Sequence, residues 1–123
     1  MTTLHGREVG FARTIWANIQ LGKIAPGGDI VNFGKSLSEG SFVEQMETTI
    51  KLILILNQAH IKQCKFEDPN FSEEPITEEE IFVLTDEEFS ALATAALGQF
   101  NEDAKTTVDA EPKKTNEVGA ALA

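Results

Sequence analysis

The chain has 123 residues, a hydrophobic content of 41% and a formal net charge of -10. A chain of this length ordinarily folds as one domain around one core. Its acidic balance disfavours binding to nucleic-acid phosphates or to anionic membranes, because both need clustered Lys and Arg. We therefore expect neither nucleic acid nor a membrane as a partner.

Cysteine content and hydropathy indicate the cellular compartment in which the protein is expected. The single cysteine, Cys64, excludes an internal disulfide framework and is typical of a reducing compartment. No signal-peptide pattern is visible at the N-terminus. The most apolar run, Leu52 to Leu56, is far shorter than the ~20 residues that span a bilayer. We expect a cytosolic protein without a transmembrane segment.

The N-terminal segment carries apolar residues at helical spacing, namely Leu4, Phe11, Ile15, Trp16 and Ile19. They predict a helix that ends near Gly22, although glycines upstream of Phe11 can delay its start. After a turn at residues 26–28, Asp29 is placed to cap a short second helix. The inward-facing positions of that helix are Ile30, Phe33 and Leu37, and Gly40 would end it.

Three capping-box patterns (Ser/Thr-x-x-Glu) precede apolar segments, and they are Ser41 with Glu44, Thr77 with Glu80, and Thr85 with Glu88. In such a box the hydroxyl accepts a backbone N–H from the first turn, and the Glu carboxylate accepts the N–H of the cap residue. The sequence therefore predicts that a helix begins at each of these points.

The segment from Ser41 to Asp68 predicts one long helix, because it contains neither Gly nor Pro and its apolar residues follow helical spacing. Leu52 to Leu56 makes this helix apolar on every side, which is typical of the middle of a bundle or of a surface covered by a partner. The alternation within Lys51 to Leu56 leaves a strand open as an alternative.

The last predicted helix covers Phe89 to Phe100, with an apolar stripe interrupted only by Gly98. From Asn101 onward the apolar period is lost, so we expect a flexible polar tail. The predicted fold is all-α, a small bundle of four or five helices over residues 1–100, followed by the tail at 101–123.

Half of the acidic residues, ten of twenty, lie between Glu67 and Glu88, and this block contains no Lys or Arg. Like charges at this density repel one another unless water or a basic partner screens them. We therefore expect the block to face solvent and to be a candidate contact surface.

No motif predicts catalysis, a cofactor or a metal site. His5 and His60 are expected to be surface or packing residues, each without a companion ligand at helical spacing. The glycine-containing turns lack the pattern of a phosphate loop. Asp68, Asn70, Ser72 and Glu79 match part of a calcium loop, but Glu73 stands where that loop needs glycine. We expect a protein that is not an enzyme.

The aromatic residues are eight Phe and one Trp, without Tyr, which suits a dry core or a groove that binds a helix. A bundle of this size leaves some apolar helix surface uncovered. The candidate partner-binding residues are Phe11, Ile15, Trp16, Met46, Phe89 and Phe100. A plain packed core and self-association through this surface are open alternatives.

The chain combines an acidic helical body over Thr3 to about Phe100, a very apolar central helix, and a polar extension after a Phe-rich helix. In this organisation it resembles the tail assembly chaperones of long-tailed phages, the lactococcal siphophage kind in particular. The resemblance implies binding to the tape measure protein, a long and aggregation-prone helical chain. It also implies that this client stays soluble until tail tube subunits polymerise around it. The implied location is the host cell cytoplasm, with absence from the mature virion.

Two alternatives from other classes are open. The first is an acidic mimic or inhibitor of a basic nucleic-acid-binding protein, favoured by the block from Glu67 to Glu88. The second is a structural head–tail component of a virion, which is supported only by the size and the helicity of the chain.

Overall fold

The computed structural model describes residues 3–109, with side chains up to Asn101. Its elements in chain order are β1 (Thr3–Leu4), β2 (Arg7–Glu8), α1 (Ile15–Ile24), the 3-10 helix η1 (Pro26–Gly28), α2 (Ile30–Ser36), α3 (Phe42–Glu67), α4 (Glu78–Phe82) and α5 (Asp86–Asp109). Within the described residues the sheet consists only of the antiparallel pair β1 and β2. The predicted helical fold class is confirmed.

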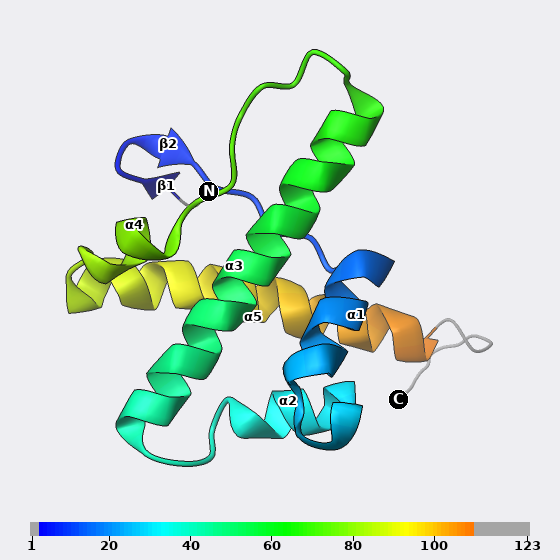
Figure 1. The fold of residues 1–123 in the computed structure, drawn as a ribbon, viewed down its shortest axis with the longest axis vertical. Helices are drawn as coiled ribbons and strands as arrows, with labels where there is room; N and C mark the ends of the chain where they lie inside the picture. The colour runs from blue at the N-terminus through cyan, green and yellow to red at the C-terminus, as the bar shows by residue number, and fades with distance from the viewer. Residues whose placement is uncertain (1–2, 110–123) are drawn as a thin grey trace.

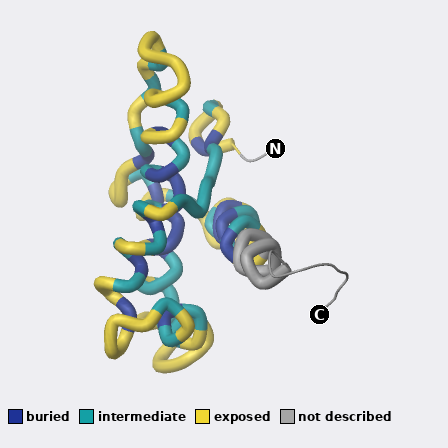
Figure 2. The backbone as a smooth tube through the Cα atoms, turned by 90° about the vertical axis from the view of Figure 1, so that its right-hand side faces the viewer, coloured by how far each residue is buried: buried dark blue, intermediate teal, exposed yellow. Residues whose placement is uncertain are grey.

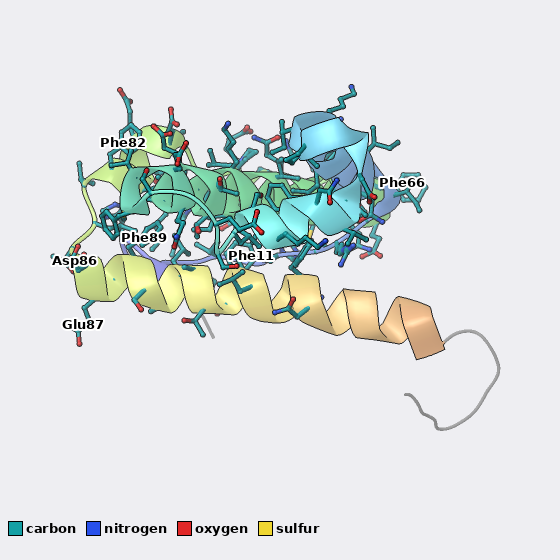
Figure 3. All side chains as sticks on the ribbon, turned by 90° about the horizontal axis from the view of Figure 1, so that it is seen from below. Phe11, Phe66, Phe82, Asp86, Glu87 and Phe89 are labelled. Atoms are coloured by element: carbon teal, nitrogen blue, oxygen red, sulfur yellow. The ribbon has the colours of Figure 1, made fainter. Side chains whose placement is uncertain are left out.

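Helix α3 is the central element, and α5 lies across it (Figure 1). Seen from below, α5 forms one layer, and α1, α2 and α3 lie together on one side of it (Figure 3). Both α1 and α5 pack against α3. The middle of α3 is buried while its two ends are exposed (Figure 2). The molecule is therefore organised around the centre of one long helix.

The all-round apolar segment of α3 lies where the neighbouring elements cover it. Leu52, Ile53 and Leu56 have no exposed surface, and Leu54 and Ile55 are half-buried against the same core. Because the backbone from Lys51 to Leu56 is helical, the alternative of a strand is wrong.

All three predicted capping boxes form. The backbone N–H groups of Ser41, Thr77 and Thr85 donate to the carboxylates of Glu44, Glu80 and Glu88 over 2.8, 2.8 and 2.9 Å. Each hydroxyl accepts the backbone N–H of the same Glu over 3.2 Å. Asp29 also caps α2 as predicted, accepting the N–H of Val31 over 2.9 Å. The starts of four helices are thus set by local hydrogen bonds.

The N-terminal segment differs from its prediction. Helix α1 begins only at Ile15, capped by Thr14, so Leu4 and Phe11 lie outside it. Leu4 belongs to β1 and is buried, and the chain reverses at His5 and Gly6, which have φ values of 50° and 85°. A positive φ is easy for glycine and excludes a continuous right-handed helix there. Apolar spacing alone did not distinguish this hairpin from a helical turn.

Helix α1 also ends later than predicted, at Ile24 instead of Gly22. The physical reason is Pro26, since the residue before a proline is disfavoured in the helical conformation. Ala25 is accordingly extended, with φ -76° and ψ 146°.

The segment between β2 and α1 runs along α3 and is attached to it by hydrogen bonds. The N–H of Ala12 donates to the carbonyl of Leu56 over 3.0 Å. The side-chain amide of Asn57 donates to the carbonyl of Gly10 over 3.0 Å, and its oxygen accepts the N–H of Ile76 over 2.9 Å. Asn57 is only 2% exposed, so one buried amide joins three separate parts of the chain.

Helix α5 is longer than predicted at both ends. It starts at Asp86, directly after the Thr85 cap, and continues to Asp109, past the predicted start of the tail at Asn101. No Gly or Pro stands between Asn101 and Asp109, so the helix is not broken where its apolar stripe ends. Residues 110–123 of the predicted tail lie outside the described residues.

We expect Asn57→Leu to destabilise the fold by about 2–4 kcal/mol, because the carbonyl of Gly10 and the N–H of Ile76 would both lose their partner inside the protein. Urea denaturation followed by circular dichroism measures this loss. Gln63→Leu, at an exposed position of the same helix, is the control and should change stability by less than about 0.5 kcal/mol. Equal stability of the two variants would contradict the role given to Asn57.

Candidate partner-binding groove

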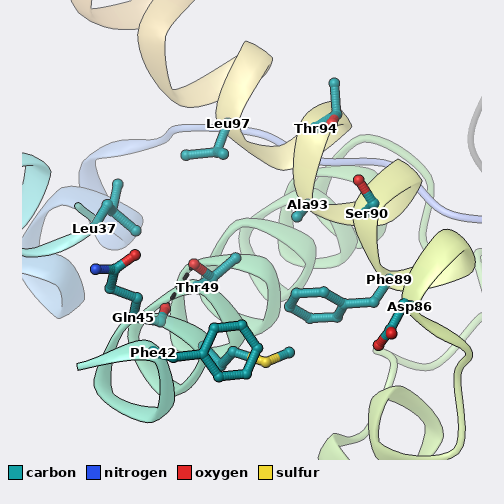
Figure 4. Close-up of a pocket in the computed structure, with 11 residues that line it drawn as sticks. Leu37, Phe42, Gln45, Thr49, Asp86, Phe89, Ser90, Ala93, Thr94 and Leu97 are labelled. Atoms are coloured by element: carbon teal, nitrogen blue, oxygen red, sulfur yellow. Dashed lines mark hydrogen bonds between the residues drawn. The ribbon is translucent and has the colours of Figure 1, made fainter.

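A groove of about 440 Å³ lies between the first turns of α3 and the first half of α5 (Figure 4). We call it the α3–α5 groove. Its lining residues are Leu37, Phe42, Gln45, Met46, Thr49, Asp86, Phe89, Ser90, Ala93, Thr94 and Leu97. The rings of Phe42 and Phe89 extend into it from opposite helices (Figure 4).

The groove follows from the way the two helices pack. The face of α5 toward the core carries small residues, and Ala93 and Ala96 are buried, which permits a close approach of the helices. Crossing helices diverge away from their closest contact. Side chains on their first turns then border an open space that neither helix fills.

Much of the lining is apolar and accessible. Phe42 is 75% exposed although it is a large apolar side chain. Met46 is half-buried, and Phe89 is half-buried against the core. A contiguous apolar surface of this kind is typical of a binding site for another chain.

The chain segments that line the groove carry no basic residues. Both chain segments that line it lack Lys and Arg completely, between Lys35 and Lys51 and between Lys65 and Lys105. Asp86 is the charged residue among those that line the groove. The neighbouring acids of the first turns face other hollows: Glu87 and Glu88 line one beside the β1–β2 hairpin, and Glu44 lines one that also holds Lys51. The groove is therefore mainly apolar, with one acid and no Lys or Arg among its lining residues.

The structure brings two of the six predicted partner-binding residues together, Met46 and Phe89, one on each wall of the groove. Ile15 is 75% exposed, but it lies at the start of α1, which packs on the opposite side of α3 in Figure 1. Phe11 is half-buried against the core.

The other two predicted residues are held within the molecule. Trp16 packs against the core, and the ammonium group of Lys62 lies 4.9 Å from its ring centre. Phe100 is only 7% exposed. Its ring centre is 6.1 Å from that of Phe33, in an edge-on arrangement, and 4.3 Å from the guanidinium carbon of Arg13. Phe100 is thus a core residue that offers little surface to a partner.

Sequence reasoning missed Phe42, Leu37 and Leu97 as groove residues. Phe42 carried a usable signal, because it directly follows the Ser41 cap and so stands at the very end of a helix, where neighbouring turns cover it least. Leu37 and Leu97 carried no such signal, since an inward-facing position in a helix looks the same in sequence whether or not another element reaches it.

The acidic block from Glu67 to Glu88 faces solvent as predicted, for none of its ten acids is buried. Two of them lie near basic groups, Glu80 at 3.9 Å from Arg7 and Glu74 at 3.7 Å from Lys65. Both pairs are partly exposed, so each contributes little to stability. His5 also contacts the carbonyl of Glu80 over 3.2 Å, which joins the hairpin to α4.

The expectation that His60 has no companion at helical spacing is wrong. Cys64 lies one turn further on α3, and its Sγ is 3.5 Å from Nε2 of His60. A thiol beside an imidazole is a pair that can activate a nucleophile. Here the ring is packed against Gly10, where even an added Cβ would overlap it, and this fits a packing role. Within the residues with described side chains, no three His, Cys, Asp or Glu gather where one metal ion could bind.

The pKa of Glu88 lies below its ordinary value of 4.5. The main cause is the backbone N–H of Thr85, the second is its hydroxyl, and His5 adds a weaker attraction. These groups all favour the ionised carboxylate. At neutral pH the cap of α5 therefore carries a negative charge beside the β1–β2 hairpin.

A lowered pKa fixes the pH range in which the Glu88 cap stabilises the protein. Its contribution is complete above pH 4.5 and is lost as the pH falls through the lower pKa of the folded state. A carboxyl titration by NMR should give a Glu88 midpoint below 4.5 in the native chain. Thr85→Ala removes the hydroxyl and keeps the backbone N–H, so it should move the midpoint only part of the way toward that value. Thr85→Ser keeps the hydroxyl and should leave the midpoint lowered. An unchanged midpoint in Thr85→Ala would contradict the contribution of the hydroxyl.

Comparison of the chain with protein-family models, with curated proteins and with solved structures found no match. Between residues 3 and 109, each helix is too short or too polar to cross a bilayer.

Proposed function

We propose that this chain is a tail assembly chaperone of the kind found in long-tailed phages, which binds the helical tape measure protein and keeps it soluble during tail assembly. The observation that best supports the proposal is the α3–α5 groove, an accessible apolar site on a chain of net charge -10. The resemblance in overall organisation, over Thr3 to about Phe100, points to the same function.

The proposed mechanism is non-catalytic and needs no cofactor. The groove covers part of an apolar stripe of the client, so that this stripe cannot pair with other client molecules. The acidic exterior keeps the complex in solution through its net charge. Several copies bound weakly along one client act together by effective concentration, and incoming tail tube subunits displace them one by one. On this proposal the protein acts in the host cytoplasm and is absent from the mature virion.

An acidic mimic of nucleic acid is the second candidate, favoured by the fact that all ten acids of the block from Glu67 to Glu88 are unburied. It predicts binding to a basic protein that weakens steeply with salt and does not depend on apolar groove residues. A structural head–tail component would instead be found in purified mature particles.

The test of the chaperone proposal is co-expression with the longest helical protein encoded nearby, with the soluble fraction of that protein as the readout. In Phe42→Asp the soluble client should fall by roughly tenfold, since a buried aromatic anchor contributes on the order of 1.5–3 kcal/mol. The variant should keep the fold, because Phe42 is largely exposed and Asp is favourable in the first turn of a helix.

Ile15→Asp is the matched control. Ile15 is also the first residue of its helix and is equally exposed, at 75%, but it lies outside the groove. This variant should keep the client soluble, and circular dichroism should show native helicity for both proteins. Loss of the client in both variants, or in neither, would contradict a function carried by the groove.

A further inference from the structure

We infer that the occupant of the α3–α5 groove is an amphipathic helix whose apolar stripe is flanked by Lys and Arg. This inference rests on the proposed function for the premise that a client chain fills the groove. It adds the chemistry of the segment that binds, which the resemblance leaves open.

The lining of the groove favours a helical occupant. Its residues come from α3, from α5 and from Leu37 just after α2. From Gln45 in α3 and from Phe89 in α5 onward, the backbone N–H groups donate within their own helices. No strand edge borders it, because the two described strands lie beside α4, away from the groove (Figure 1). An extended peptide would find few backbone partners there, whereas a helix satisfies its own backbone hydrogen bonds.

The apolar side chains of the groove are spaced to receive a helix. Phe42 and Met46 are one turn apart on α3, and Phe89, Ala93 and Leu97 are successive turns on α5. Two rows of side chains with the spacing of helical turns form a channel into which the ridge of a third helix fits. The bound segment would present apolar anchors at intervals of three or four residues.

Charge complementarity then decides what flanks those anchors. Asp86 lines the groove, and the sequence places no Lys or Arg on either lining segment of a chain whose net charge is -10. At physiological ionic strength such a charge acts over about 8 Å. Acidic flanks on the occupant would be repelled, and basic flanks would be attracted and oriented.

The same argument disfavours a second copy of this chain as the occupant. Each copy would bring the same Asp86 and no lining cation, so two grooves facing each other would place like charges together. The most apolar helical segment of the chain, Leu52 to Leu56, is enclosed in its own core and is not available to a neighbour.

Binding of designed peptides to the full chain tests the inference. The probes are two labelled amphipathic peptides of roughly 20 residues, a length that supports a helix, with one identical Leu stripe and either Lys or Glu at the flanking positions. Fluorescence anisotropy at about 0.15 M salt gives their affinities. The Lys-flanked peptide should bind at least about tenfold more tightly than the Glu-flanked one.

Variants of the chain then locate the binding. Phe42→Asp should weaken the Lys-flanked peptide by on the order of tenfold, and Ile15→Asp should leave it unchanged. The variant Asp86→Asn should weaken it by roughly threefold and should reduce the dependence on salt. This charge is outside the capping hydrogen bonds, so the helix start stays intact.

Three results would overturn the inference. Equal affinity of the two peptides would show that the occupant does not need basic flanks. Binding that is insensitive to Phe42→Asp would place the peptide elsewhere on the acidic surface. A Phe42-dependent dimer that excludes the peptide would make a second copy of this chain the occupant. The proposed function fails separately: if the co-expressed client is not kept soluble while the Lys-flanked peptide still binds in the groove, the chaperone role is wrong and the recognition chemistry stands.

Discussion

The buried amide of Asn57 is the contact on which the arrangement of the helices depends. It holds the carbonyl of Gly10 on one side and the N–H of Ile76 on the other, so both the segment before α1 and the segment before α4 are fixed to the centre of α3. A buried amide is costly unless all its groups are paired, which makes this geometry specific. Only three residues separate α4 from α5, so the position of α4 in turn directs the start of α5.

Helix α5 is fixed along its length as well as at its start. Arg13 donates to the carbonyl of Phe100 over 2.8 Å and lies over its ring, while the ring packs against Phe33 of α2. Near its middle, buried alanines allow α5 to approach the core closely. The first turns of α5 and of α3, together with Leu37, border the open space between the two helices. The α3–α5 groove is therefore formed by the packing of the free protein, which lowers the ordering cost of binding.

Acids stabilise the helix starts on both sides of the groove, and Asp86 among them also lines it. Glu44 and Glu88 complete the capping boxes of α3 and α5, and Asp86 and Glu87 stand in the first turn of α5, where acids favour the helix dipole. The lowered pKa of Glu88 keeps that negative charge in place at neutral pH. Asp86 thus serves the start of α5 and also places a negative charge at an apolar site.

The sequence by itself determined where most helices begin and that α3 is one long helix, because caps, prolines and apolar period act through neighbouring residues. It also identified Met46 and Phe89, one on each wall of the groove. Only the tertiary structure decided that Leu4 turns back in a hairpin, that Phe100 is enclosed by Arg13 and Phe33, and that Phe42 stays exposed. An apolar side chain at a helical position carries the same local signal whether it is covered or not, and its exposure is set by contacts with residues far away along the chain.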